Sequence, residues 1–262
     1  MIITLLVILG LALGSFVNAF VWRLHEGKNW INDHSECTVC HHKLKAKDIV
    51  PVISWLYLRG RCRYCQSKIS IQYPIVELSV TLLFILSYIF WPAIISGLQI
   101  LIFSIWLLIL TGLVALAVYD LRYMLLPTRL IYSLLFLAVV SSVIILLISK
   151  DPISIIINLL FSTLIGGGLF YILYMISGGK WIGGGDVRLG FLLGLLASSA
   201  ARSFLLIFIA SLIGAAVSII LISIKRLKRK SLIPFGPFLI VALFIVQFWG
   251  NNILSWYQGL FF

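Results

Sequence analysis

Residues 101–119 read LIFSIWLLILTGLVALAVY, a stretch of nineteen residues without a charged side chain. An apolar run of about twenty residues matches the length of a helix that crosses the hydrocarbon core of a bilayer. The whole chain has this character, because 62% of its 262 residues are hydrophobic and only 11% are charged, against roughly 45–50% and about 25% in soluble domains. This composition excludes collagen-like, disordered, coiled-coil and disulfide-rich secreted proteins.

Similar apolar runs recur along the chain and predict its fold class. In lipid, backbone N–H and C=O groups must find their hydrogen-bond partners within the segment itself. The runs are also too long for barrel strands, so each is predicted to be a helix. The first run lacks the basic start and the cleavage pattern of a secretory signal, and we retain it as a span. We predict an all-α polytopic membrane protein with about eight transmembrane helices, over residues 2–21, 75–91, 94–118, 130–148, 153–176, 182–201, 203–224 and 236–249.

The charges of the chain predict its orientation. Twenty Lys and Arg residues oppose eight Asp and Glu residues, and most of the cations lie in 22–73 and 225–230. Placing 22–73 in the cytoplasm puts eighteen of the twenty inside and leaves only Lys150 and Arg202 outside, as the positive-inside rule requires. The basic run 225–230 is expected to contact anionic membrane lipid. Nucleic acid is not expected as a partner, and the sequence leaves the oligomeric state open.

All four cysteines lie in the one sizeable hydrophilic segment, between the first two predicted spans. Cys37-x-x-Cys40 and Cys62-x-x-Cys65 have the spacing of a tetrahedral site with four thiolate ligands. Because thiolates in a reducing cytoplasm bind metal rather than form disulfides, we predict a structural Zn²⁺ ion that helps this segment to fold. Three histidines are alternative ligands near the first pair: His34, His41 and His42.

These features divide the chain into three predicted parts. Residues 1–22 form the first transmembrane helix, and residues 23–73 form the cytoplasmic zinc-binding segment, which we call the cysteine loop. Residues 74–262 form a membrane domain of seven helices.

Two aspartates stand out in this apolar chain. After Glu77 only Asp120, Asp151 and Asp186 are acidic, and Asp151 is predicted to be a solvated turn residue beside Lys150. Asp120 and Asp186 both fall at cytoplasmic helix ends, where an ionisable group indicates function. Two neighbouring carboxyl groups in a medium of low dielectric hold one proton between them, which suits them to activate a water molecule. Helix-end ion pairs are the alternative: Asp120 with Arg122 or Arg129, and Asp186 with Arg188.

Gly183, Gly184 and Gly185 directly precede Asp186. Three residues without a Cβ atom would let an extended substrate backbone approach the carboxylate, so all three are candidate substrate-binding residues. Glu77 opens the second predicted span and is a further candidate for substrate binding, with helix capping or pairing to an arginine of the cysteine loop as the alternative.

Several ordered motifs across nearly the whole chain resemble one family. They are Gly14-Ser15-Phe16-Val17-Asn18 with Arg23-Leu24, the two Cys-x-x-Cys pairs, Pro51 to Leu56, Arg59 to Cys62, Tyr73 to Leu78, Asp120 with Leu126-Pro127, Gly183 to Leu189, and Pro234 to Phe238. With them the chain resembles the type IV prepilin peptidases, which are aspartic proteases of the GxGD kind. One position departs from the family pattern: Thr128 follows Leu126-Pro127, where an acid or Asn is frequent.

The resemblance implies a function for the chain. Asp120 and Asp186 would be the catalytic pair that cleaves the basic leader of prepilins or pseudopilins at the cytoplasmic face of the bacterial inner membrane. Family members commonly also methylate the new N-terminus with S-adenosylmethionine, and the cysteine loop has been linked to that step. The alternatives are a presenilin-like intramembrane aspartic protease, a cation transporter that uses the two aspartates, and a zinc-stapled scaffold without chemistry.

Overall fold

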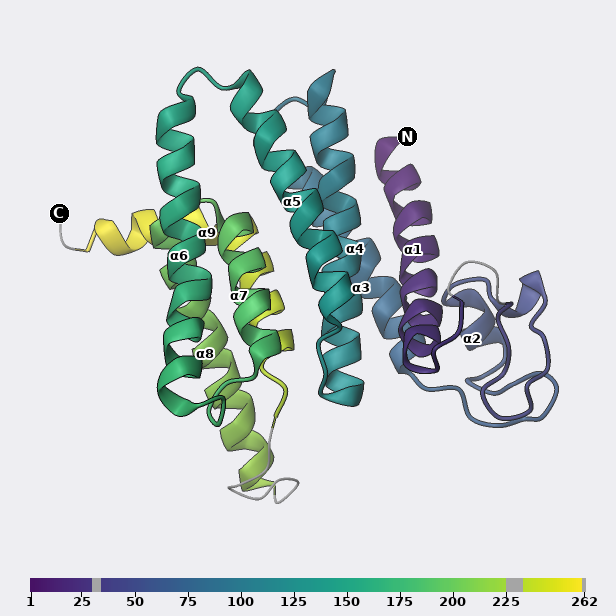
Figure 1. Ribbon diagram of the computed structural model, residues 1–262. Coiled ribbons are helices and arrows are strands. Elements are labelled where there is room, and N and C mark those ends of the chain that lie inside the picture. Colours follow the sequence, from purple (N-terminus) through teal and green to yellow (C-terminus); the bar gives the residue numbers. More distant parts are fainter. Residues whose placement is uncertain (30–33, 225–232, 261–262) are drawn as a thin grey trace. The chain divides into compact units, whose positions relative to one another are not determined.

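The computed structural model describes residues 1–29, 34–224 and 233–260 and confirms the predicted all-α fold in these ranges (Figure 1). Within them no β-strand forms, apart from two isolated bridges in the cysteine loop. Seven of the described helices are long and apolar enough to cross a bilayer: α1, α3, α4, α5, α6, α8 and α9. The chain is therefore a multi-pass membrane protein. The basic run 225–230 lies outside the described residues.

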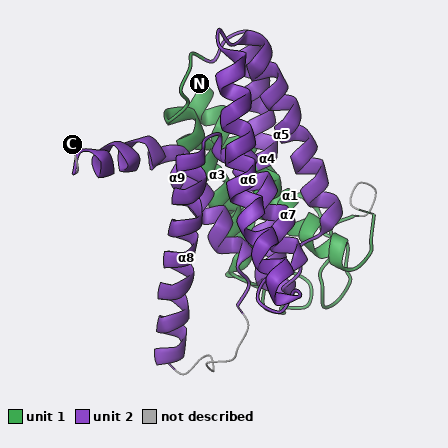
Figure 2. Cartoon of the chain, turned by 60° about the vertical axis from the view of Figure 1, so that its left-hand side comes forward, with its two compact units in different colours: residues 1–94, 110–115 green, residues 95–109, 116–262 purple. Residues whose placement is uncertain are grey.

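The chain forms two compact units (Figure 2). Unit 1 comprises residues 1–94 and 110–115, and unit 2 comprises residues 95–109 and 116–262. The division into parts 1–22, 23–73 and 74–262 stays a prediction.

Unit 1 contains α1 (Ile2–His25), the short 3₁₀ helix η1 (Ala46–Asp48), α2 (Ile53–Tyr57) and α3 (Gln72–Ile89). Helices α1 and α3 pack closely at two glycines of α1. A Cβ atom on Gly10 would lie 2.6 Å from the Cα atom of Thr81, and one on Gly14 would lie 2.6 Å from the Cα atom of Glu77. The two glycines are one helical turn apart and let the two backbones approach.

Unit 2 contains most of α4 (Leu98–Tyr123), with α5 (Thr128–Ile148), α6 (Pro152–Ser177), α7 (Gly184–Ala197), α8 (Ala200–Ser223) and α9 (Gly236–Gln258). Helices α6 and α7 pack closely at glycines of both helices. A Cβ atom on Gly166 would lie 2.6 Å from the Cα atom of Gly194, and one on Gly190 would lie 2.7 Å from the carbonyl oxygen of Gly166. Next to this contact, Ser162 donates to the carbonyl oxygen of Gly194 at 2.6 Å, which adds a buried polar link between the helices.

Helix α7 is shorter than the predicted span 182–201. It has fourteen residues and a length of about 21 Å, which is less than the hydrocarbon core of about 30 Å. It ends because Ser198 takes a left-handed conformation (φ 66°) and Ser199 caps the start of α8 by accepting from the backbone N–H of Arg202. Ser198 and Ser199 therefore make a tight turn inside the predicted span 182–201, which hydropathy alone suggests is one continuous apolar segment.

The α6–α7 contact generates a prediction about two glycines on one helix. Gly166→Ala places a methyl group against the backbone of α7, and we expect it to lower stability by about 1–3 kcal/mol. Gly168→Ala is the control, because nothing lies within 4 Å of its Cβ position. Thermal unfolding of the purified proteins in detergent measures the difference. Equal unfolding temperatures for the two variants would show that the helices do not approach as described.

Candidate functional site

Asp120 lies in the last turn of α4, and only 5% of its surface is exposed. Helix α4 ends at Met124, a left-handed residue whose backbone N–H donates to the carbonyl oxygen of Asp120. The carboxyl group of Asp120 accepts a hydrogen bond from the backbone N–H of Gly236, the first residue of α9. A Cβ atom on Gly236 would lie only 2.6 Å from Oδ2 of Asp120, so a side chain at this position would displace the carboxyl group.

Asp186 lies in the first turn of α7. Gly183 is the capping residue of this helix, and its backbone N–H donates to the carboxylate of Asp186, three residues later. A carboxylate at this position accepts a hydrogen bond from one of the backbone N–H groups that lack a partner at the helix start. Its negative charge also interacts favourably with the helix dipole.

The structure brings the two aspartates together. Their carboxyl groups lie close enough for the charge of Asp186 to act on Asp120. The side chain of Leu126 fills the space beside them, because Cβ atoms on Gly185 and Gly236 would lie 3.0 and 3.5 Å from it. The last turn of α4 and the first turns of α7 and α9 therefore meet at one place in unit 2.

The alternative ion pairs do not form among the described residues. No ion pair there includes Asp120 or Asp186. The guanidinium of Arg188 donates to Oγ1 of Thr128, the first residue of α5, at 2.5 Å. Thr128, which departs from the family pattern, thus joins the start of α5 to the first turn of α7.

The three glycines before Asp186 differ in their surroundings. Gly183 caps the helix, and Gly185 packs against Leu126. Gly184 has room for a Cβ atom, since the nearest atom would be Cε2 of Tyr174 at 3.9 Å. A side chain at 185 would therefore press against Leu126, whereas position 184 is free for a substrate contact. In the sequence, Gly236 appeared only within the motif Pro234 to Phe238, and nothing in the sequence placed it beside Asp120.

Glu77 lies in unit 1, whereas the two aspartates lie in unit 2. Its side chain is buried in α3 and accepts from the backbone N–H of Val52 at 2.7 Å. Val52 has φ 61°, a conformation that is rare for a β-branched residue. Glu77 thus ties the cysteine loop to α3, and its part in substrate binding stays a prediction.

The two cysteine pairs sit in turns of the same conformation. The backbone N–H of His41 donates to the carbonyl oxygen of Cys37, and that of Gln66 donates to the carbonyl oxygen of Cys62. His41 and Gln66 both have positive φ, 55° and 58°. Each turn is also closed by a bridge between residues seven apart, Glu36 with Lys43 and Arg61 with Lys68. The loop therefore presents two equivalent knuckles, each with two thiols.

The four sulfur atoms fit one metal ion. All of them lie within 4.8 Å of one another, and Sγ of Cys37 is 3.8 Å from Sγ of Cys65. Four ligands at about 2.3 Å around a tetrahedral ion place their sulfur atoms about 3.8 Å apart. Two of the three histidines near the first pair have other contacts, since His41 contacts Glu36 and the ring of His42 lies 3.7 Å from that of Tyr64. The described cluster of possible ligands contains the four cysteines and no histidine.

The thiols also show why a cation suits the site. Burial raises the pKa of Cys37, but backbone N–H groups of Cys40 and Val39 and the neighbouring thiols lower it to about 6. The N–H of His42 lowers the pKa of Cys40, but burial and the thiols of Cys65 and Cys37 raise it to about 11. One thiolate therefore disfavours the next, and a bound cation would relieve this repulsion.

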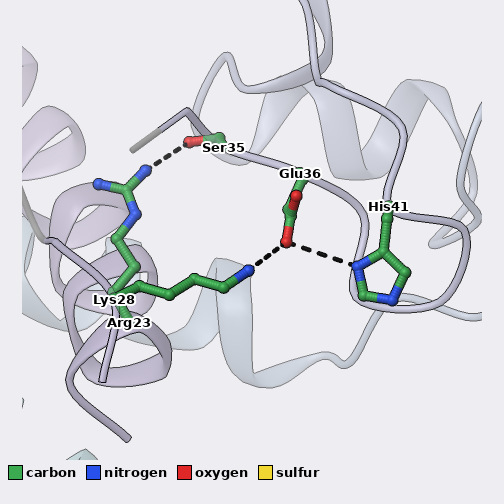
Figure 3. A network of polar contacts seen from close by, with 5 residues as sticks. All are labelled: Arg23, Lys28, Ser35, Glu36 and His41. Carbon is green, nitrogen blue, oxygen red and sulfur yellow. Dashed lines mark hydrogen bonds and ion pairs between the residues drawn. The ribbon is translucent and has the colours of Figure 1, made fainter. Parts of the chain in front are cut away.

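Polar contacts hold the cysteine loop together around these knuckles. At the end of α1, Arg23 donates to Oγ of Ser35, and Lys28 pairs with Glu36, which also contacts His41 (Figure 3). From the second knuckle, Arg63 donates to Oδ1 of Asp48 in η1 at 2.6 Å and the hydroxyl of Tyr64 donates to Oδ2 at 3.0 Å. Burial raises the pKa of Asp48, but the hydrogen bond from Arg63 and those from Lys45 and Tyr64 bring it below its usual range.

Comparison with known proteins covers nearly the whole chain. Residues 8–91 match the bacterial peptidase A24 N-terminal domain, and residues 102–219 match the type IV leader peptidase family. A prepilin leader peptidase/N-methyltransferase of Aeromonas hydrophila is 31% identical over 97% of this chain and 93% of its own length. Proteins of the same name from Pseudomonas aeruginosa and Aeromonas salmonicida are 28% and 33% identical, over 96% and 88% of this chain and 91% and 77% of their own lengths. No solved structure matches the chain.

The sulfur geometry generates a prediction about metal content. We expect one metal ion per purified chain, measured by elemental mass spectrometry. Cys62→Ser removes the most buried thiol and should abolish binding, because three ligands hold a structural ion poorly. His41→Ala is the matched control in the same loop and should retain the metal. Loss of metal in both variants would indicate that a histidine is a ligand.

Proposed function

The chain belongs to the type IV leader peptidase family, and on that premise we propose that it is a membrane-embedded aspartic peptidase that removes the leader from prepilins or pseudopilins. It also methylates the new N-terminus, with S-adenosylmethionine as the co-substrate. The observation that supports the peptidase most directly is the approach of Asp120 and Asp186, two acids from distant parts of the chain, in one buried site. We assign no residue to S-adenosylmethionine.

Asp120 and Asp186 have complementary roles in hydrolysis. The two carboxyl groups hold one proton between them, because two adjacent charges in an apolar site repel each other. The charged carboxylate takes a proton from a water molecule as its oxygen attacks the scissile carbonyl carbon. The protonated carboxyl donates its proton to the carbonyl oxygen, which gives a tetrahedral intermediate with two hydroxyl groups. As the peptide bond breaks, the carboxyl that took the water proton passes it to the leaving amine, and the other carboxylate takes a proton back from one hydroxyl group. Gly236 and Gly183 hold the two carboxyl groups in place through their backbone N–H groups.

The site lies at the cytoplasmic face of the bacterial inner membrane in this proposal. Eighteen of the twenty Lys and Arg residues fall on that side when the predicted spans alternate. The apolar helix of a prepilin stays in the bilayer while the segment before it, which carries the leader, reaches the two aspartates. Membrane lipid thus surrounds both the enzyme and its substrate.

Zn²⁺ is the ion proposed for the cysteine loop. Four thiolates with tetrahedral spacing are typical of structural zinc sites, which contribute directly to folding. The ion would be held by Cys37, Cys40, Cys62 and Cys65 and would fix the two knuckles to each other.

The catalytic assignment is tested by neutral replacements of equal size. Asp120→Asn and Asp186→Asn should each lower cleavage of a purified prepilin in proteoliposomes by about 10²–10⁴-fold, because each removes an acid or base. Asp151→Asn is the control, since Asp151 is an exposed residue that caps α6. Mass spectrometry of the product reports cleavage and methylation together. Cleavage at the normal rate by either variant would remove the pair from the mechanism.

The three glycines generate a second test. Gly184→Ala should lower the rate of cleavage by between about 10- and 100-fold if the substrate backbone approaches here, because a displacement of about 1 Å has effects of this size. The fold has room for this methyl group, so thermal stability should not change. Gly168→Ala is the control in open space. Undiminished cleavage by Gly184→Ala would show that the substrate does not approach at this position.

A further inference from the structure

The cysteine loop exposes apolar side chains around α2 that no described part of the chain covers. Ile53, Leu56 and Tyr57 are 65%, 61% and 76% exposed, although none of them belongs to a candidate span. They are spaced by three and four residues and therefore share one face of the helix. Val50 and Ile71 nearby are also exposed, at 41% and 61%. A cluster of large exposed apolar groups on a hydrophilic segment indicates an interaction surface.

The contact between Val52 and Glu77 fixes the level of this surface along α3. Glu77 is the sixth residue of α3 and lies about 8 Å along the helix axis from its start. Since the backbone N–H of Val52 donates to Glu77, α2 begins beside the first two turns of a membrane span. The interfacial region of a bilayer is about 5–8 Å thick on each side. Figure 1 shows α2 beside the ends of α1 and α3.

The exposed surface of α3 continues this apolar cluster. Exposed side chains on α3 and just before it follow the spacing of one helix face: Ile71, Ile75, Leu78 and Leu82. In a membrane span such a face contacts lipid. This face begins at Ile71, two residues after Ile69, and the carbonyl oxygen of Ile69 accepts a hydrogen bond from the indole N–H of Trp55 in α2. The lipid-facing surface therefore reaches the level of α2.

The charges around α2 complement an anionic surface. The cysteine loop has nine Lys and Arg residues against four acids, and two of the acids, Glu36 and Asp48, are paired with Lys28 and Arg63. Six cations remain exposed: Lys43, Lys45, Lys47, Arg59, Arg61 and Lys68. Lys47 and Arg59 flank α2 on both sides. Apolar residues flanked by cations are typical of elements that lie in the interface of a bilayer with anionic lipid.

We propose that α2, with Val50 and Ile71, is a membrane-interface anchor that inserts into anionic phospholipid and holds the cysteine loop against the bilayer. The Val52–Glu77 hydrogen bond sets the depth of the anchor, and the cations bind lipid phosphate groups. The anchor does not depend on the peptidase assignment, because it rests on contacts within unit 1 alone. It keeps the two cysteine knuckles at the membrane surface, where a substrate leader emerges from the bilayer.

Photo-crosslinking to lipid tests the anchor in the full-length protein. p-Benzoylphenylalanine replaces Leu56, and the purified protein is illuminated in nanodiscs of phosphatidylglycerol. We expect lipid adducts on the intact chain, detected by mass spectrometry, at about ten times the yield found when the same probe replaces Val39. Val39 is the matched control, because it is also an exposed apolar residue (62%) of the cysteine loop but lies in the first knuckle. Equal yields at the two positions would overturn the proposal.

Two further experiments separate the contribution of charge from that of the apolar contact. They also test whether protein, in place of lipid, binds this surface. Replacing phosphatidylglycerol by phosphatidylcholine should lower the adduct yield at position 56 several-fold. The double variant Lys47→Gln with Arg59→Gln should lower it in phosphatidylglycerol alone. Crosslinks from position 56 to an added prepilin or to a second copy of this chain, in place of lipid, would show that the surface binds protein and would overturn the anchor.

Discussion

The structure depends on how an apolar protein accommodates carboxyl groups. A helix start leaves backbone N–H groups without partners, and both aspartates of the candidate site use such groups. Asp186 accepts from the capping residue of α7, and Asp120 accepts from the first residue of α9. Because the two helix starts lie beside the end of α4, two acids that are 66 positions apart in the sequence reach one place, and no described cation forms an ion pair with either of them.

Close packing without Cβ atoms makes this arrangement possible. Gly236 allows α9 to start against the carboxyl group of Asp120, and Gly166 with Gly194 allows α6 to support α7 along its length. A bilayer offers no hydrophobic driving force between helices, so such contacts between small residues carry much of the helix association. The glycines of this chain therefore position the site as much as they open it to a substrate.

The cysteine loop is organised by a different principle, because a segment of about fifty residues has too small a core to fold by hydrophobic burial alone. Two knuckles of one conformation bring four thiols together, and the hydrogen bond between Val52 and Glu77 joins the loop to a membrane span. The buried carboxylate of Glu77, which the sequence made a candidate for substrate binding, thus has a hydrogen bond to the backbone of the cysteine loop. The four-thiol cluster and the ion pairs replace part of the missing core, and the proposed metal ion and membrane anchor would supply the rest.

Much of this could be predicted from the sequence, because the relevant signals are local. Apolar runs of about twenty residues indicated the helices, and the cysteine spacing indicated the four-thiol cluster. The length of α7 could not be predicted, because Ser198 and Ser199 make a turn inside a run whose hydropathy is continuous. The partner of Glu77 was equally hidden, since it is a backbone N–H group that Val52 presents only through its unusual φ angle.

The sequence by itself determined which residues can cross lipid, which can bind metal and which can exchange protons, since these properties belong to side chains and their spacing. The resemblance already paired Asp120 with Asp186, but the tertiary structure alone decided that they meet beside Leu126 and that Gly236 and Gly183 supply their hydrogen bonds. The physical reason is that these contacts join backbone groups at the ends of different helices, and no pattern within one segment records which helix ends will meet.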